Sequence, residues 1–361
     1  MRIDFIMQSL NSGGAERVLA TLANELCKNH TLRIITFHQK TRDPFYLDPA
    51  IERLNIDKCK RKNKTWQSIE NLAKFYRLKS NQPQILISFI HSNNLIATIV
   101  AKILNIKVIV SEHTNHTVIT SKKVKWTRQY VYRWANKTTV LTNFDIDYYK
   151  KYKADVCVMP NPIEIPKVNL DFVTRDKCIL AVGDLNRYEG KGFDNLLYAT
   201  ESILKNNIDW SLKLVGGGEY GLTELKKIVD KLNIKKQVIF LGFCNDINGL
   251  MQRSQIFVLP SKYEGLPMGL MEALANGMSS IAYDCPSGPS DLINDNVNGL
   301  LIENQNREKL ENGISKLIND ENLRKRLGDK GPESLRKYEL SNVVTQWNIL
   351  FDEVITDNGT K

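Results

Sequence analysis

The chain alternates between strand-like and helix-like segments along almost its whole length, and this alternation restricts the fold more than any other feature. Twelve short apolar runs have the length of a strand, at residues 2–8, 31–37, 84–90, 107–111, 138–141, 156–159, 178–182, 211–215, 238–241, 256–259, 279–282 and 299–302. Amphipathic helical patterns fill the gaps between them. Strands that alternate with helices form parallel sheets with helices on both faces. We therefore predict an α/β protein with doubly wound parallel sheets.

A proline-rich segment separates the two series of strands. The chain has 361 residues, more than one hydrophobic core usually serves. Three prolines occur in the seven residues 160–166, which is typical of a linker. We predict one Rossmann-like domain over residues 1–160, a second over 161–340 and a C-terminal helix over 341–361. Two such domains would place a site in the cleft that they face, at the carboxyl ends of both sheets.

The composition indicates a soluble globular protein without a signal peptide or membrane span. Apolar residues make up 42% and charged residues 25% of the chain, which excludes a disordered protein. The N-terminus runs directly into a strand-like segment, and polar residues interrupt the apolar stretch 95–110. The cysteines show no C-x-x-C pair, so we expect reduced cytoplasmic thiols and no metal site; they are Cys27, Cys59, Cys157, Cys178, Cys244 and Cys285.

The charge is distributed unevenly between the two halves. Residues 1–160 carry 26 basic and 12 acidic side chains, a net charge of +14. The remaining residues carry 24 basic and 28 acidic side chains, a net charge of −4. A basic first half favours an anionic partner for the first domain.

Two glutamates flank the start of a predicted helix in the second half. Glu264 follows a buried strand that Pro260 ends, Pro267 suits the first helical position, and Glu272 lies inside the helix. The N–H groups of the first turn would point out of the helix and bind an anion, namely those of Met268, Gly269 and Leu270. A nucleotide-sugar offers a diphosphate for these N–H groups and hydroxyls for the two carboxylates. The alternative is a helix whose glutamate merely complements the dipole, and the spacing alone leaves both open.

Other strand ends carry groups suited to phosphates and sugars. Gly13 and Gly14 open the first helix, where paired glycines let the backbone approach a phosphate or simply form a tight turn. His113 follows the strand 107–111 and would donate to a phosphate or sugar oxygen, or else is a surface or capping histidine. Arg187 and Lys191 lie in the loop after the strand 178–182, where their charges suit a diphosphate, although a solvated loop is the alternative.

Two further patterns argue against cofactors. Asp145-Ile146-Asp147 resembles the D-x-D of metal-dependent sugar transferases, but acids at a helix start are expected as caps. The sequence has no acidic residue at the strand end where one would bind a nicotinamide cofactor. We expect neither a metal nor a cofactor.

Taken together, the motifs resemble glycosyltransferase family 4, retaining enzymes with the two-domain GT-B fold. The resemblance covers nearly the full length. It rests above all on Pro260-Ser261 followed by Glu264-Gly265-Leu266-Pro267 and Glu272. Further matching segments are residues 13–17, 111–113, 160–162 and 191–194 and the closing helix around Gln346-Trp347. It implies that the closing helix crosses back to the first domain.

The resemblance also implies roles for individual residues. Glu264 would hold donor-sugar hydroxyls and Glu272 the ribose, with the N–H groups of Gly269 and Leu270 on the phosphate. Lys191 would bind the diphosphate, His113 would lie near the reacting sugar, and Gly14 would close over the phosphates. The family normally has arginine where this chain has Asp184, and we expect Arg187 to replace it.

The segment 284–291 and the stretch 13–26 are similar to bacterial transferases that build glycans on lipid carriers, many of which use UDP-sugars. The first domain would then receive the acceptor. A basic and aromatic segment at 121–137 suits an anionic membrane or a diphospho-lipid, through Lys122, Lys123, Lys125, Trp126, Arg128 and Trp134. The alternative is a solvated basic helix whose aromatic rings pack inward.

We therefore expect a retaining, metal-independent glycosyltransferase that moves a hexose or N-acetylhexosamine from a UDP-sugar to a lipid-linked oligosaccharide, in the assembly of bacterial polysaccharide, lipopolysaccharide or other glycans. It would lie in the cytoplasm, peripheral on the inner face of the membrane. The alternatives are a GDP-sugar (mannosyl) transferase, a UDP-sugar epimerase of the same fold and a basic nucleic-acid-binding protein. The last is disfavoured because the basic segments match no known reader of nucleic acid.

Overall fold

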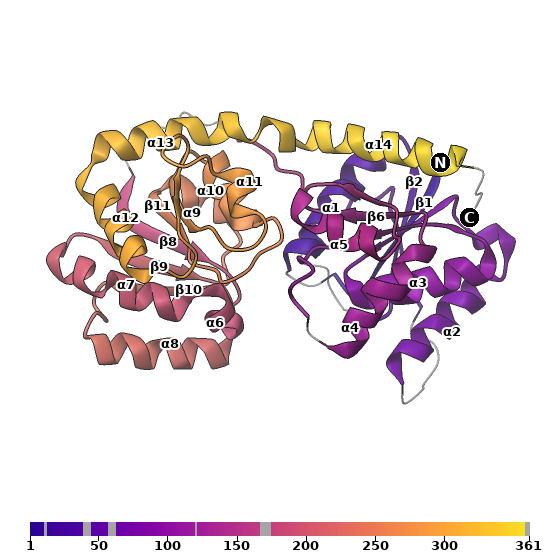
Figure 1. The fold of residues 1–361 in the computed structure, drawn as a ribbon, viewed down its shortest axis with the longest axis horizontal. Helices are drawn as coiled ribbons and strands as arrows, with labels where there is room; N and C mark the ends of the chain where they lie inside the picture. The colour runs from indigo at the N-terminus through magenta and orange to yellow at the C-terminus, as the bar shows by residue number, and fades with distance from the viewer. Residues whose placement is uncertain (11–12, 39–44, 57–62, 120, 167–174, 358–361) are drawn as a thin grey trace. The chain divides into compact units, whose positions relative to one another are not determined.

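The computed structural model describes residues 1–10, 13–38, 45–56, 63–119, 121–166 and 175–357. Asn11 and Ser12, beside the paired glycines, and Cys59 lie outside this range. The chain divides into two compact units (Figure 1). Unit 1 comprises residues 1–162 and 340–361, and unit 2 comprises residues 163–339. Among the described residues, no helix is both long and apolar enough to cross a membrane.

Unit 1 contains a seven-stranded parallel sheet in the order β3-β2-β1-β4-β5-β6-β7. Its strands are β1 Arg2–Met7, β2 Thr31–Thr36, β3 Glu52–Asn55, β4 Ile85–Phe89, β5 Lys107–Ser111, β6 Lys137–Val140 and β7 Val156–Val158. Its helices are α1 Gly14–Leu26, α2 Lys64–Tyr76, α3 His91–Leu104, α4 Lys122–Trp126, α5 Ile146–Lys151 and α14 Leu340–Thr356.

Apolar side chains from alternate strand positions form the core of unit 1. Ile6, Leu86, Val108 and Val140 pack against residues of α2 and α3 on one face of the sheet, because successive strand residues point to opposite faces. The closing helix α14, yellow in Figure 1, belongs to this unit and lies beside α1. His30 bonds Asn348 of α14 at 2.8 Å between Nε2 and Oδ1. The last helix therefore completes the unit that the first strand begins.

Unit 2 contains a six-stranded parallel sheet in the order β10-β9-β8-β11-β12-β13. Its strands are β8 Asp176–Val182, β9 Ser211–Val215, β10 Val238–Gly242, β11 Ser254–Leu259, β12 Ser279–Tyr283 and β13 Leu300–Ile302. Its helices are α6 Tyr188–Lys191, α7 Phe193–Asn206, α8 Glu219–Leu232, α9 Ile247–Gln252, α10 Met268–Ala275, α11 Pro289–Leu292, α12 Arg307–Asn319 and α13 Glu321–Ser334.

The two faces of the unit 2 sheet are covered by different helices. Val258 points into a core formed with α7, α8 and α12. Phe257, its neighbour, points the other way, towards Gly269 in α10. The loops that follow β8, β9, β11 and β12 all leave from the carboxyl edge of this sheet, where ligands bind in α/β folds.

The structure contains all twelve predicted strands, within two residues at each end, together with β3, which the sequence pattern does not reveal. The five described cysteines are free thiols.

Candidate active site

Glu264 and Glu272 lie on either side of the start of α10, as the sequence predicts. The buried strand β11 ends at Leu259, and Pro267 precedes the helix with an extended backbone. The side chain of Glu264 is 11% exposed, and Glu272 is buried. Two nearly enclosed carboxyl groups therefore bracket one helix start.

The N-terminal turn of α10 offers fewer N–H groups than predicted. The N–H of Leu270 donates to the carbonyl of Pro267 at 3.1 Å, so the prediction that it is free is wrong in this structure. A tight first turn makes this i to i+3 bond at many helix ends. Among the described residues, the N–H groups of Met268 and Gly269 have no backbone acceptor. These two N–H groups are the ones that this helix end can offer to an anion.

Lys191 and Glu264, which the sequence separates by 73 positions, are in direct contact. The ammonium Nζ lies 2.7 Å from Oε1 of Glu264, and the lysine side chain is 22% exposed. A lysine has three N–H donors, and only one is engaged in this pair. The remaining donors can serve oxygen atoms of a ligand.

Close backbone packing places Lys191 at this position. Gly192 ends α6 with a φ of 69°, and a Cβ at this residue would lie 1.9 Å from the carbonyl oxygen of Pro260. The N–H of Lys262 donates to the carbonyl of Gly190 at 3.0 Å. The loop after β8 is thus pressed against the loop after β11, and only glycine fits at the contact.

Gly269 lies in ordinary van der Waals contact with the sheet. A Cβ on this residue would lie 3.5 Å from Cζ of Phe257 and 4.0 Å from Cβ of Val182. The start of α10 therefore packs directly on the ends of β8 and β11. An anion at this helix end would lie over the carboxyl edge of the sheet.

The segment after β12 supports the loop that carries Glu264. Ser287 donates through Oγ to the carbonyl of Gly265 at 2.9 Å. Gly288 has a φ of 96°, and a Cβ there would lie 2.4 Å from the same carbonyl oxygen. Its N–H donates to Asp291 at 3.2 Å. The sequence pattern gives no role to these residues, because Gly265 lies 22 positions before Ser287.

Arg187 lies beside the site in a cavity of its own. It is exposed and lines a cavity of 240 Å³ with Asn186, Tyr188, Glu189, Gly190, Tyr220 and Tyr263. Asp184, at the position where the family normally has arginine, caps the 3-10 turn Leu185–Arg187 by accepting the Asn186 N–H at 3.0 Å. Neither Lys191 nor Glu264 lines this cavity. The replacement of the family arginine by Arg187 stays a prediction.

The glycines after β9 serve mainly to pack adjacent loops. A Cβ on Gly216 would lie 1.7 Å from the carbonyl oxygen of Gly183, and one on Gly218 would lie 2.5 Å from the N atom of Asn186. Gly217 differs, since a Cβ there meets nothing within 4 Å. Of the three glycines after β9, Gly217 alone leaves open space where a ligand could contact bare backbone.

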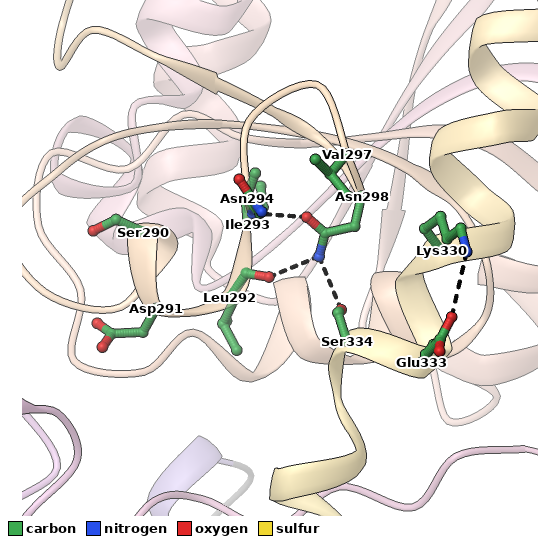
Figure 2. A pocket seen from close by; sticks show the side chains of 10 residues that line it. All are labelled: Ser290, Asp291, Leu292, Ile293, Asn294, Val297, Asn298, Lys330, Glu333 and Ser334. Carbon is green, nitrogen blue, oxygen red and sulfur yellow. Dashed lines mark hydrogen bonds and ion pairs between the residues drawn. The ribbon is translucent and has the colours of Figure 1, made fainter.

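A larger cavity of 490 Å³ lies elsewhere in unit 2, and Figure 2 shows its lining. Asn298 links its walls by donating to the carbonyl of Leu292 and to Oγ of Ser334, both at 2.8 Å. Lys330 and Glu333, both from α13, also line it. None of the residues predicted for the site lines this cavity.

In unit 1, His113 follows β5 as predicted. Its ring stacks on Phe89 with centroids 4.8 Å apart, and its Nε2 lies 3.2 Å from Oγ of Ser111. Burial lowers the pKa of His113 from 6.5 to about 4, since Glu112 offsets only part of the desolvation. His113 is therefore a neutral ring near pH 7, able to accept a hydrogen bond or to donate one.

Arg128 was predicted to lie on the basic surface, and this is wrong. Its side chain is 1% exposed and pairs with Glu112 at 2.7 Å. Tyr132 donates to the other oxygen of Glu112. Arg128 also donates to the carbonyls of Asn115, His116 and Val118 at 3.0–3.4 Å. A buried charge needs a partner, and here that partner fixes the loop that carries His113.

The rest of the basic and aromatic segment is exposed. Lys122, Lys123 and Lys125 face solvent, and Lys123 donates to Thr65 at the start of α2 at 2.6 Å. Trp126 is 49% and Trp134 45% exposed. All the residues predicted to form this surface except Arg128 are therefore exposed, and these rings do not pack inward.

Gly14 is the first residue of α1 and is exposed. Asp145 accepts hydrogen bonds from His116 and does not cap α5 with its side chain. The expectation of a cap is therefore wrong for Asp145.

Over the part of the chain that the structure describes, no group of three or more His, Cys, Asp or Glu residues is arranged to hold a metal.

The chain has two doubly wound α/β units, and in unit 2 a lysine–glutamate pair lies beside the start of a helix. This combination is typical of the GT-B glycosyltransferases. The chain belongs to glycosyltransferase family 4. The family model for glycosyl transferases group 1 matches residues 163–334, and that for Glycosyltransferase Family 4 matches residues 12–166.

Two curated relatives span nearly the whole chain. A Campylobacter jejuni α-1,4-N-acetyl-D-galactosaminyltransferase, named for the acceptor GalNAc-GalNAc-diNAcBac-PP-undecaprenol, is 32% identical over 98% of this chain and 99% of its own. The amylovoran biosynthesis glycosyltransferase AmsD of Erwinia amylovora is 27% identical over 94% of this chain and 95% of its own.

Solved structures share the fold. Sucrose-phosphate synthase from Thermosynechococcus elongatus has a TM-score of 0.81 and 17% identity, over 98% of both chains. Anabaena HepE, solved with UDP-glucose, has a TM-score of 0.79 and 16% identity, over 98% of this chain and all of that one.

Proposed function

We propose that this glycosyltransferase moves a hexose or N-acetylhexosamine from a UDP-sugar to a lipid-linked oligosaccharide, with retention of configuration and without a metal. The observation that carries the proposal is the contact between Lys191 and Glu264 at 2.7 Å beside the start of α10. The acceptor named for the Campylobacter relative and the UDP-glucose bound to Anabaena HepE support the choice of substrates.

In the proposed reaction, each group acts on a separate part of the donor. Lys191 and the helix start neutralise the diphosphate, Glu264 holds hydroxyls of the transferred sugar, and Glu272 holds the ribose. The acceptor oxygen bonds to the anomeric carbon on the face from which the phosphate leaves, and the leaving phosphate takes the acceptor proton. Lys191 supplies the positive charge that a metal provides in other transferases.

The experiment is a thermal-shift series with UDP, GDP and ADP, each with and without EDTA. UDP at about 100 times its dissociation constant should stabilise the protein by about 2.7 kcal/mol, and EDTA should not change this shift. A shift with GDP alone would indicate a mannosyl or fucosyl donor. A new sugar isomer from UDP-sugar alone, seen by NMR, would indicate an epimerase.

The matched variants are Glu264→Ala and Glu303→Ala. Glu303 also contacts a lysine at 2.7 Å, but its pair with Lys309 is exposed on the surface of the same unit. We expect Glu264→Ala to abolish transfer while the protein stays folded, and Glu303→Ala to behave as wild type. Normal turnover by a folded Glu264→Ala variant would contradict the assignment.

A further inference from the structure

A histidine–aspartate pair with no role in the proposed reaction lies at the carboxyl ends of two adjacent strands of unit 1. His116 is in the loop after β5, and Asp145 closes the 3-10 turn Asn143–Asp145 after β6. Nδ1 of His116 lies 2.7 Å from Oδ1 of Asp145, and the carboxyl group also accepts the backbone N–H of His116 at 2.7 Å. This sheet edge is where α/β proteins bind ligands.

The pair fixes the direction of the imidazole. Asp145 is nearly inaccessible, with 4% of its side chain exposed, whereas 23% of the His116 side chain is exposed. Because the buried carboxylate accepts the Nδ1 proton, the lone pair of a neutral ring resides on Nε2. No described residue forms a hydrogen bond with Nε2. The ring therefore presents one oriented acceptor.

Aromatic rings and a buried arginine hold His116 in place. The imidazole stacks on both Phe144 and Tyr148, with centroids 5.1 and 4.4 Å away and interplanar angles of 22° and 14°. Arg128 contacts the carbonyl of His116 and of its neighbours. A side chain held in one orientation by several contacts is typical of a residue that binds a ligand with defined geometry.

Phe144 adds an apolar surface beside this acceptor, since its side chain is 43% exposed. A sugar ring offers both complementary parts, a C–H face for an aromatic ring and hydroxyl groups for a fixed acceptor. A phosphate fits less well than a hydroxyl group, because an Nε2 without a proton offers it no donor and the nearby Asp145 carboxylate repels a second anion.

We propose that His116, oriented by Asp145, binds a hydroxyl group of the acceptor saccharide, with Phe144 as the adjoining apolar surface. This proposal rests on the proposed function, because it requires a saccharide acceptor. His116 acts here in binding and orientation and takes no proton in the reaction.

The test begins with wild-type enzyme and a panel of diphospho-undecaprenol oligosaccharides ending in N-acetylgalactosamine, galactose or glucose, with the matching UDP-sugars. The acceptor that is turned over becomes the probe. His116→Phe keeps the stacked ring and removes both nitrogen atoms. We expect the KM for the acceptor to rise about three- to tenfold, as for the loss of one hydrogen bond, with the UDP-induced thermal shift unchanged.

His30→Phe is the matched control. His30 also bonds one polar side chain and contacts one aromatic ring, Phe351, but it precedes β2 and so lies at the opposite edge of the sheet. Its KM for the acceptor should equal that of wild type. Asp145→Asn keeps the shape of the pair and should raise the same KM by a smaller factor.

A second measurement does not depend on the stability of the variants. The chain has only five histidines, so their ring nitrogen resonances can be followed individually by NMR. Addition of the probe acceptor should shift the His116 Nε2 resonance, and addition of UDP should not. An unmoved resonance, or an unchanged KM in His116→Phe, would overturn the His116 proposal alone. Absence of transfer by wild type with every acceptor would overturn the proposed function and this inference with it.

Discussion

The imidazole ring of His113 stays neutral because it is buried. The ring stacks on Phe89, and burial lowers its pKa to about 4. A histidine that stays neutral when folded opposes folding at acid pH, because the unfolded chain binds a proton that the folded chain does not.

This difference predicts the pH dependence of stability. Since the folded pKa lies below the unfolded value of 6.5, stability is fully present above pH 6.5 and falls as the pH drops towards 4. At pH 5 the His113 contribution amounts to about 2 kcal/mol. Urea unfolding of unit 1 at pH 7.5 and 5 should show this loss in wild type and much less of it in His113→Phe. An NMR titration of His113 with a midpoint near 6.5 would contradict the prediction.

At the scale of residues, the sequence reveals the groups but not their contacts. The positions of Lys191 and Glu264 after β8 and β11 single them out, yet the direct ion pair depends on the packing of Gly192 on Pro260. The run of lysines around Arg128 predicts an exposed side chain, whereas Glu112 draws it into the core. The spacing around Asp145 suggests only a metal ligand or a cap, because it does not reveal the contact with His116.

Among the elements, the loop after β12 has the clearest testable role. Gly288 has a φ of 96° and contacts the carbonyl of Gly265, just after Glu264. Gly288→Ala should destabilise unit 2 by about 1–3 kcal/mol, and it should weaken UDP binding because the Gly265 loop must move. Thermal unfolding and UDP titration would measure both effects.

Gly217→Ala is the control for this variant, since a Cβ there meets nothing within 4 Å. It should leave the free energy of unfolding nearly unchanged. Equal losses of stability in the two variants would show that the conformation of Gly288 has no special importance.

Strand positions follow from the sequence where the strand is an apolar run and not where it is polar. The buried strands are short apolar runs, and all were predicted. β3, Glu-Arg-Leu-Asn at an edge of the sheet, is polar with no residue fully buried, so period and composition do not reveal it. The first turn of α10 was predicted with three free N–H groups, but the i to i+3 bond of Leu270 arises from local geometry that no residue type specifies.

For the whole molecule, the uneven charge predicts membrane binding through unit 1. The exposed Lys122, Lys123 and Lys125 lie beside Trp126 and Trp134. At about 1 kcal/mol per basic residue near an anionic surface, alanine at all three lysines should weaken binding to phosphatidylglycerol vesicles by roughly 3 kcal/mol, or about a hundredfold. Vesicle sedimentation at constant salt measures this.

Alanine at the exposed Lys226, Lys231 and Lys236 in and after α8 is the control, because it removes the same charge from unit 2. These changes should leave vesicle binding nearly intact. An equal loss in both triple variants would mean that net charge, and not this surface, attracts the membrane.

The closing helix α14 has a consequence for the order in which the protein matures on the ribosome. Its buried Trp347 and Phe351 belong to unit 1, although the whole of unit 2 is synthesised before them. Unit 2 can fold as soon as it emerges, whereas unit 1, although made first, must wait for the final helix to cover its core. The nascent chain should therefore complete unit 2, which carries the proposed nucleotide site, before its first half is fully stable, and that first half is the part exposed longest to chaperones and proteases.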